Sequence, residues 1–325
     1  MMRIYCLAIA FLAAVSPSGA AAQDYPSRTV TLVVPYAAGG GTDILARALA
    51  QKFSERFGKP FVVDNRPGGG TVIAAQSVAK AAPDGHTLIF APSGMLTINP
   101  TLYNSLPYDA AKDFVPVALV SNVPFVLVVT PSLPVRSVAD LIRYGKGKPP
   151  GSLAYASPGT GTMGHLAGEL LKQMTGLDIT PVPYKGNMPA LTDVVAGHVH
   201  LTFTDPAISP PMIREGKLRA LGVTSLKRAG ALPDVPPLAE TGLPGFEAIS
   251  WHMIMAPAGT PRPVVDRLHA ELKSILALAS VQDQVTRIGL IPVATPSVVE
   301  LRAFVAAEMD RWGKLVHQVG IAGTE

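Results

Sequence analysis

The stretch that decides the fold runs Thr29-Val-Thr-Leu-Val-Val34, then Pro35, and then Tyr36-Ala-Ala-Gly-Gly-Gly-Thr42-Asp43. Its first part is an apolar, β-branched run, which is typical of a buried strand. Beyond the loop, apolar residues recur at helical spacing up to Phe57, and Gly58 ends the predicted helix. A strand that leads through a glycine-rich loop into a helix is the opening unit of an α/β fold with a parallel sheet.

The same order of strand, loop and helix continues along most of the chain. A strand at residues 61–64 is followed by another glycine loop and a short helix, and residues 87–91 form the next strand. The pattern starts again beyond residue 114, and a strand at residues 152–157 leads through Pro158-Gly-Thr-Gly-Thr162 into a further helix. The sequence therefore predicts an α/β protein with two lobes, each a sheet covered by helices.

We expect the two ends of the chain to build one lobe and the middle to build the other. Lobe 1 would comprise residues 23–122 and 250–325, and lobe 2 would comprise residues 123–249. The two crossings between them, near residues 121–124 and 248–251, would form a hinge. Because α/β proteins bind ligands beyond the carboxyl ends of their strands, the cleft between the lobes is the predicted binding site.

Residues 1–22 have the features of a secretory signal peptide. Arg3 precedes an apolar stretch that is too short to span a membrane, and Ala20-Ala-Ala22 supplies small residues for cleavage. We expect cleavage after Ala22 and export to the periplasm. The single cysteine, Cys6, would be lost with the peptide.

The composition argues against several classes of function. Of the 325 residues, 15% are charged and 48% are hydrophobic, which predicts a compact core and not a disordered chain. The balance of 27 basic and 23 acidic residues, with 6% aromatic residues and no basic run, does not describe a nucleic-acid-binding surface. One cysteine cannot form an internal disulfide framework or a multi-cysteine metal site.

The loop from Tyr36 to Asp43 predicts an anion site. Glycines can adopt positive φ and turn successive backbone N–H groups into one concavity, and the helix N-terminus adds partial positive charge. A carboxylate or phosphate would then be held by backbone donors and the Thr42 hydroxyl, without a buried lysine. The alternative is that Thr42 only caps the helix and the glycines form a tight connection.

The loop from Ser157 to Thr162 repeats this arrangement, with ordinary capping by Thr160 or Thr162 as its alternative. Two donor-rich loops, one in each lobe, suit a ligand with an anionic group at each end. The second loop also spells G-x-G-x-x-G, but the next strand ends without an acidic residue and no Walker lysine is present. We therefore expect no nucleotide and no other cofactor.

Groupings that could catalyse a reaction are sparse. The seven histidines are scattered without an H-E-x-x-H pattern, and there is no G-x-S-x-G motif. We expect neither a metal site nor enzymatic activity; an exported enzyme that acts on a carboxylated substrate is the rival hypothesis. Asp205, just after the strand at residues 199–203, is predicted either to cap a helix or to contact an amine or hydroxyl group of the ligand.

Motifs in order along nearly the whole chain carry a family resemblance. They include Val34-Pro-Tyr-Ala-Ala-Gly-Gly-Gly-Thr-Asp43, Val62-Val-Asp-Asn-Arg-Pro-Gly68, Val78-Ala-Lys-Ala-Ala-Pro-Asp-Gly85, His165-Leu-Ala-Gly-Glu169, Val182-Pro-Tyr-Lys-Gly186 and Gly216-Lys-Leu-Arg-Ala-Leu221. The chain thereby resembles the Bug-type (TctC-like) extracytoplasmic solute receptors of tripartite tricarboxylate transporters.

The resemblance implies a type II periplasmic-binding-protein fold whose lobes close on a small carboxylate like a Venus flytrap. The ligand would be a di- or tricarboxylate, an amino acid or an aromatic carboxylate. The partners would be the membrane permease subunits, or a signalling protein in their place, and we expect a monomer. The ligand-binding residues predicted in this way are Tyr36, Ala37, Ala38, Gly39, Gly40, Thr42, Asp43, Ser157, Gly159, Thr160, Gly161, Thr162, His165 and Asp205.

One loop departs from the pattern of the family. Members commonly read Pro-Gly-Ala-Gly-Gly-Asn-Ile-Gly after the second strand, whereas this chain reads Pro67-Gly-Gly-Gly-Thr71-Val72-Ile73-Ala74. If that loop lines the cleft, Thr71 and Val72 make the cleft narrower and more apolar. We therefore add both residues to the predicted site, and they indicate a ligand with an apolar or aromatic portion.

Overall fold

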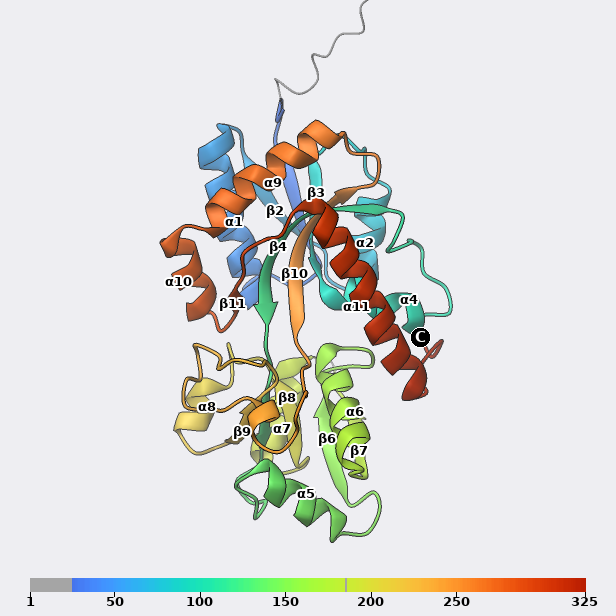
Figure 1. Cartoon of the computed structure of the whole chain (residues 1–325), viewed down its shortest axis with the longest axis vertical. Helices are drawn as coiled ribbons and strands as arrows, with labels where there is room; N and C mark the ends of the chain where they lie inside the picture. The colour runs from blue at the N-terminus through green and yellow to red at the C-terminus, as the bar shows by residue number, and fades with distance from the viewer. Residues whose placement is uncertain (1–24, 185) are drawn as a thin grey trace, which may run out of the picture.

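The computed structural model describes residues 25–184 and 186–325 (Figure 1). The predicted signal peptide lies outside these residues, so it stays a prediction. Among the described residues, no helix combines the length and the apolar character needed to cross a bilayer. Figure 1 shows two sheets with their helices, one above the other, joined by chain segments that run between them.

The first sheet has six strands within the described residues, in the order β11-β4-β10-β3-β1-β2. Its strands β1, β2 and β3 are parallel, whereas β10 pairs antiparallel with both β3 and β4, and β11 pairs antiparallel with β4. The bounds are β1 Val30–Val34, β2 Phe61–Asn65, β3 Thr87–Pro92, β4 Phe114–Val123, β10 Ser250–Pro257 and β11 Ile291–Pro292.

The second sheet has the order β7-β6-β8-β5-β9. Strand β6 is parallel to β7 and β8, and β5 is antiparallel to β8 and β9. The bounds are β5 Val126–Val129, β6 Leu153–Ser157, β7 Ile179–Pro183, β8 Leu201–Thr204 and β9 Arg219–Val223. The prediction of parallel sheets is thus right for the βαβ units and wrong for the strands next to the crossings. Those strands run antiparallel because the chain enters and leaves each sheet there.

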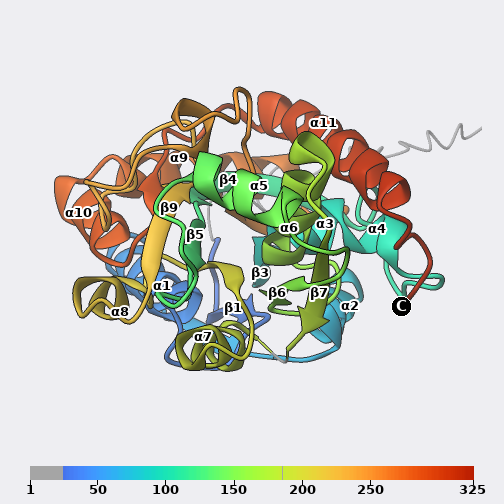
Figure 2. The same ribbon diagram turned by 90° about the horizontal axis from the view of Figure 1, so that it is seen from below.

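Helices cover both sheets (Figures 1 and 2). Around the first sheet lie α1 Gly41–Phe57, α2 Val72–Ala79, α3 Ser93–Thr97, α4 Asn99–Leu102, α9 Arg262–Leu276, α10 Ala279–Arg287 and α11 Val298–Gln318, with the 3₁₀ turn η2 Gly69–Thr71. Around the second lie α5 Val138–Lys146, α6 Met163–Thr175, α7 Asn187–Ala196 and α8 Pro210–Arg214, with the 3₁₀ turn η3 Leu238–Glu240.

The opening unit forms for the reasons that its sequence indicates. Strand β1 is buried over almost its whole length, and α1 buries Leu45, Leu49 and Phe53 on one face. The Phe53 ring stacks on Phe61 of β2 with ring centroids 4.8 Å apart, which joins helix and sheet. Gly58 ends the helix in the left-handed region at φ 64°. The predicted strand, loop and helix are therefore confirmed.

The two sheets draw on different parts of the chain. The first takes strands from residues 30–123 and 250–292, and the second takes strands from residues 126–223. One crossing follows Val123 at the end of β4, and the other precedes Ser250, which pairs with Val123 in the sheet. The two crossings therefore lie side by side. The residue limits of the lobes and their motion about a hinge stay predictions.

Candidate ligand-binding cleft

A cavity of about 470 Å³ opens between the two sheets. The first lobe contributes the loops after β1, β2 and β3, the end of β4 and the start of β10. The second contributes the loops after β6, β7 and β8, and residues near α10 close one side. Because strands and helix starts from both sheets meet here, the cavity is the place where α/β architecture favours a ligand.

The cavity collects part of the predicted site. Its lining includes Tyr36, Gly40, Thr42, Thr71, Gly161, Thr162 and Asp205 from that prediction. The other predicted residues are not part of the lining: Ala37, Ala38, Gly39, Asp43, Val72, Ser157, Gly159, Thr160 and His165. Direct contact of any of these residues with a ligand stays a prediction, but two of the second group have a clear structural task, described below.

The N-terminus of α1 presents unpaired backbone donors to the cavity. The first N–H that bonds within the helix is that of Ile44, to the Gly40 carbonyl at 3.0 Å. The N–H groups of Gly41, Thr42 and Asp43 find no acceptor among the described residues. Gly40 is the N-cap and Thr42 lies inside the helix, so the alternative that Thr42 only caps the helix is wrong. Of the three glycines, only Gly39 has positive φ, at 92°.

Asp43 holds this loop from behind. Its carboxylate accepts hydrogen bonds from the Gly39 N–H at 2.9 Å, from Arg47 Nε at 3.0 Å and from Asn65 Nδ2 at 2.9 Å. Burial alone would raise the pKa of the Asp43 carboxyl, but these three hydrogen bonds outweigh it and hold the pKa below its usual range. The charged carboxylate therefore fastens the loop to α1 and β2.

The second loop uses several of its donors for its own structure. The Thr162 hydroxyl donates to the Gly159 carbonyl at 2.8 Å and accepts from the His165 N–H, so Thr162 caps α6 as the alternative reading had it. The Gly161 N–H donates to His165 Nδ1 at 3.1 Å. The donors left for a ligand are the N–H groups of Met163 and Gly164, which line the cavity and have no acceptor among the described residues.

Buried side chains of α6 itself hold this loop in place. His165 is 5% exposed, and burial is the main cause that lowers the pKa of its imidazole. The ring is therefore neutral, and Nδ1 can accept the Gly161 N–H. On its other side His165 Nε2 lies 4.0 Å from Glu169 Oε1. Glu169 is also buried and accepts from Tyr155 at 2.8 Å and Lys172 at 2.9 Å.

Asp205 faces the same cavity from the end of β8. Its Oδ1 accepts the Ala207 N–H at 2.8 Å, which closes a turn, and no donor among the described residues reaches Oδ2. Burial raises the pKa of the Asp205 carboxyl. Asn187, at the start of α7, also lines the cavity, and its Oδ1 is buried without a partner in the described part of the chain. Both groups are acceptors, so this wall favours a ligand that brings a hydrogen-bond donor.

The sequence did not point to the wall formed by β10. His252 lines the cavity, with its Nε2 3.2 Å from Thr42 Oγ1 and its Nδ1 3.0 Å from Ser121 Oγ. Ser250 lies two residues earlier on the same strand face, and its hydroxyl oxygen is 2.7 Å from the hydroxyl oxygen of Ser93. The only signal was this spacing of two polar residues in an apolar strand. Whether these two polar residues reach the cavity depends on the pairing of β10 with β4 and β3, and no local pattern reveals that pairing.

Thr71 takes up the position expected for it, but the apolar lining has other sources. Thr71 lines the cavity at φ 81°, a conformation that a β-branched residue rarely adopts. Asn99 holds this turn by donating to the Gly70 carbonyl at 2.9 Å. Val72 lies outside the lining, and the apolar contacts come instead from Met95, Val123, Phe125, Met163, Ile288 and Leu290.

The described residues that line the cavity include no lysine and no arginine. The free donors in the described lining include the backbone N–H groups at the starts of α1 and α6. The described residues also hold no group of three or more His, Cys, Asp or Glu side chains placed to bind a metal ion.

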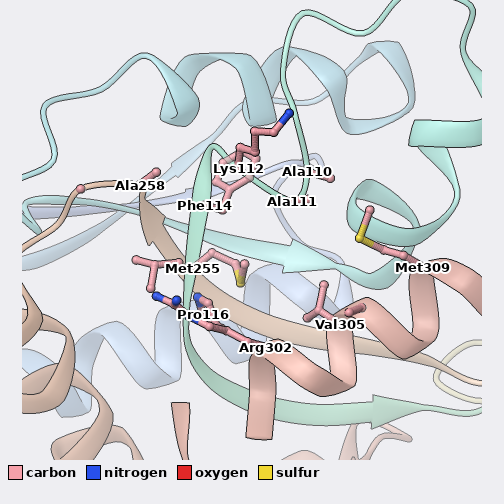
Figure 3. Close-up of a pocket in the computed structure, with 13 residues that line it drawn as sticks. Ala110, Ala111, Lys112, Phe114, Pro116, Met255, Ala258, Arg302, Val305 and Met309 are labelled. Carbon is pink, nitrogen blue, oxygen red and sulfur yellow. The ribbon is translucent and has the colours of Figure 1, made fainter. Parts of the chain in front are cut away.

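A second cavity, of about 290 Å³, lies at the opposite ends of β4 and β10, under α11 (Figure 3). Phe114, Pro116, Met255 and Val305 give it an apolar lining, and the Lys112 amino group at its rim is paired with Asp109. None of the predicted site residues reaches it. The chemistry that could select a small polar solute is in the cleft between the sheets.

Two α/β sheets that enclose a cavity lined by helix N-termini define the architecture of periplasmic binding proteins. Residues 45–321 match the family model described as the tripartite tricarboxylate transporter family receptor. The chain belongs to this family. The predicted fold class and family are both confirmed.

Solved structures agree with this assignment. An R. palustris protein solved with adipate is 44% identical with a TM-score of 0.83, over 92% of this chain and 99% of that one. The periplasmic binding protein BugD is 35% identical with a TM-score of 0.79, over 92% and 99%. MatC from Rhodopseudomonas palustris, solved with malate, is 35% identical with a TM-score of 0.77, over 90% and 100%.

Proposed function

We propose that this protein is an exported receptor that captures a small carboxylate between its two lobes and delivers it to the permease of a tripartite tricarboxylate-type transporter. The observation that carries the proposal is the start of α1. There the N–H groups of Gly41, Thr42 and Asp43 have no acceptor among the described residues, and Gly41 and Thr42 line the cavity. A helix N-terminus with free donors suits a carboxylate.

The rest of the ligand would lie against the second lobe. The free N–H groups of Met163 and Gly164 suit a second anionic group, and the acceptor Oδ2 of Asp205 suits a hydroxyl or ammonium substituent. Related structures hold adipate and malate, which are both dicarboxylates. The apolar lining between the two ends would contact the carbon chain of the ligand.

The energetics are reasonable for a receptor. Micromolar affinity needs about −8 kcal/mol. For a ligand of roughly nine heavy atoms this is about −0.9 kcal/mol per atom, which is below the ceiling of about −1.5 kcal/mol per atom for small ligands. Enclosure between two lobes with oriented donors can supply this without any catalytic step.

The proposal is tested by a thermal-shift screen with mono-, di- and tricarboxylates, amino acids and aromatic acids, followed by calorimetry of each hit. We expect at least one carboxylate to raise the melting temperature and to bind with micromolar affinity. Mass spectrometry should recover it unchanged, because the protein binds and does not convert its ligand. Chemical turnover of a hit would support the rival enzyme hypothesis. Loss of uptake of that carboxylate on deletion of the gene would support the permease as the partner.

The sharpest single variant is Gly40→Asp. A Cβ at Gly40 meets no heavy atom within 4 Å, and its φ of −78° is open to any residue, so the fold should tolerate the change. A carboxylate added here should repel an anionic ligand and weaken its binding by about tenfold or more, since two like charges a few ångströms apart near a protein surface repel each other by about 1–4 kcal/mol.

Gly40→Ala is the matched control, because it adds the Cβ without the charge and should bind the ligand like the wild type. Calorimetry on the three proteins separates the two effects. Equal affinity of Gly40→Asp and Gly40→Ala would remove the α1 N-terminus from the site.

A further inference from the structure

His252 connects the carboxylate site proposed above to the centre of the first sheet. Its ring lies between Thr42 Oγ1 of α1 and Ser121 Oγ of β4, at 3.2 Å from Nε2 and 3.0 Å from Nδ1. The residue is 5% exposed, and its ring centroid is 5.0 Å from that of Phe90. Thr42 and His252 both line the cavity, whereas Ser121 is fully buried beneath them.

The imidazole in this place is neutral. Burial lowers the pKa of His252 to about 3, and no charged group acts on it. A neutral imidazole has one N–H donor and one acceptor nitrogen, so one of its two neighbours must give a proton and the other must receive one. Two arrangements are therefore open to the chain of Ser121, His252 and Thr42.

Ser121 decides between them. If Nδ1 carried the proton, Nδ1–H would donate a hydrogen bond to Ser121 Oγ. The proton of the Ser121 hydroxyl itself would then have no acceptor among the described residues. Ser121 is 0% exposed, so water cannot satisfy that proton at the surface. An unsatisfied buried donor is strongly unfavourable. If Nε2 carries the proton instead, Ser121 donates to Nδ1, Nε2–H donates to Thr42 Oγ1, and every buried proton has an acceptor.

The second arrangement leaves the proton of the Thr42 hydroxyl free. Thr42 then receives the bond from His252 on an oxygen lone pair and directs its own O–H towards the cavity, beside the free N–H groups of the first turn of α1. The Thr42 hydroxyl and the free N–H groups of Gly41 and Thr42 that line the cavity are then all donors, which matches a carboxylate. The opposite arrangement would turn the Thr42 lone pairs towards the anion.

We infer that His252, protonated on Nε2, is a positioning residue that holds the Thr42 hydroxyl as a hydrogen-bond donor to the ligand carboxylate. This inference rests on the proposed function, because it assigns a role within the same carboxylate site. His252 acts through Thr42 and through the tautomer that Ser121 selects.

The tautomer is tested first, on the protein without ligand. Two-bond ¹H–¹⁵N correlation spectra of uniformly ¹⁵N-labelled protein at pH 7 distinguish protonated from unprotonated ring nitrogens. His252→Gln assigns the resonances by their loss. We expect a protonated Nε2 and an unprotonated Nδ1. A protonated Nδ1, or a ring protonated on both nitrogens, would overturn the inference.

The coupling to Thr42 is tested by a double-mutant cycle with His252→Leu and Thr42→Val, measured by calorimetry with adipate, malate and any carboxylate found in the screen. We expect His252→Leu to weaken binding about tenfold in the wild-type background and to have no further effect when Thr42 is already valine. His252→Gln keeps an amide donor and should bind within about threefold of the wild type. It also provides a readout if His252→Leu does not fold.

The outcomes separate the two proposals. If the wild type binds a carboxylate but the losses of His252→Leu and Thr42→Val add independently, the positioning role of His252 fails and the proposed function stands. If the wild type binds no carboxylate in the whole panel, both fail. A cycle that shows coupling, together with the Nε2–H tautomer, supports both.

Discussion

Single side chains around the cleft divide into those that line the cavity and those that hold its loops. Asp43 and His165 belong to the second kind, since both are buried and hydrogen-bonded to the N–H group of a loop glycine. Their position in glycine-rich motifs suggested ligand contact, because sequence spacing does not show on which side of a loop a side chain lies. His252 shows the reverse case: a residue from a distant strand lines the cavity.

The neutral state of His252 has a consequence for stability against pH. Its pKa is about 3 in the folded protein and about 6.5 in an unfolded chain, so below pH 6.5 the unfolded state binds more protons. The contribution of His252 to the free energy of unfolding is complete above pH 6.5. It falls as the pH drops towards 3, by up to about 1.4 kcal/mol per pH unit.

His252→Gln removes this term, so its free energy of unfolding should depend less steeply on pH than that of the wild type. Urea unfolding at pH 7, 5.5 and 4.5 measures the difference. Other titrating groups are shared by both proteins and cancel in the comparison. Parallel pH profiles would show that His252 is not buried in its neutral form.

At the scale of elements, the start of α1 depends on contacts with its neighbours. Gly40 and the following residues offer no side-chain cap, so the Asp43 carboxylate orders the loop by joining the Gly39 N–H, Arg47 and Asn65 at the end of β2. The three partners come from the loop, the helix and the next strand. The loop that presents the free donors is thus fixed by the sheet beside it.

Asp43→Ala should therefore weaken both the fold and the ligand site. We expect a loss of about 1 kcal/mol in the free energy of unfolding, because the part-buried hydrogen bonds of the Asn65 amide and the Gly39 N–H to Asp43 are lost, while the Asn65 amide keeps the Tyr36 carbonyl as an acceptor. Arg47 is half exposed and contributes less. Ligand affinity should also fall, because the loop is no longer held.

Glu55→Ala in the same helix is the matched control, since Glu55 pairs only with exposed Lys52 and Gln51 and should change stability by less than about 0.5 kcal/mol. Chemical denaturation and calorimetry on both variants give the two quantities. An Asp43→Ala protein that matches Glu55→Ala in stability and affinity would contradict the anchoring role.

At the scale of the whole molecule, the lobes touch beside the cleft as well as at the crossings. Gly161 of the second loop faces Leu102 and Ile98 of the first lobe, and a Cβ at Gly161 would collide with the Leu102 side chain. Gln173 of α6 also donates to Gln318 of α11 at 3.1 Å. Close approach of the lobes thus depends on the absence of a side chain at Gly161.

Gly161→Ala tests this dependence, with Gly176→Ala as its control. Both glycines have nearly the same positive φ, 68° and 67°, so alanine should strain each backbone by roughly 1–2 kcal/mol. A Cβ at Gly176 meets nothing within 4 Å, whereas at Gly161 it meets the other lobe.

Both variants should lose similar stability, but only Gly161→Ala should also weaken ligand binding, by about tenfold for roughly 1.4 kcal/mol of lost lobe contact. Small-angle scattering with saturating ligand should then show a larger radius of gyration for Gly161→Ala. Equal ligand affinity of the two variants would mean that lobe closure does not depend on this contact.

Local pattern was enough to predict most strands and long helices, the α/β class and the two glycine loops. Apolar periodicity and the glycines that end helices reflect contacts within one element or with the next element. Consecutive residues are therefore enough to predict them. The short helices α3, α4, α8 and α10 and the two-residue strand β11 were not predicted. Their few residues carry too little periodicity, and β11 exists only by pairing with β4.

The amino-acid sequence by itself determined the fold class, the family and the placement of donor-rich loops at helix starts. Only the tertiary structure decided which groups on those loops are free. Asp43 and His165 take up loop N–H groups from behind, and β10 brings His252 to Thr42 across 210 positions of the chain. The physical reason is that a hydrogen bond depends on distance in space, and strand pairing between distant segments sets that distance without leaving a local pattern.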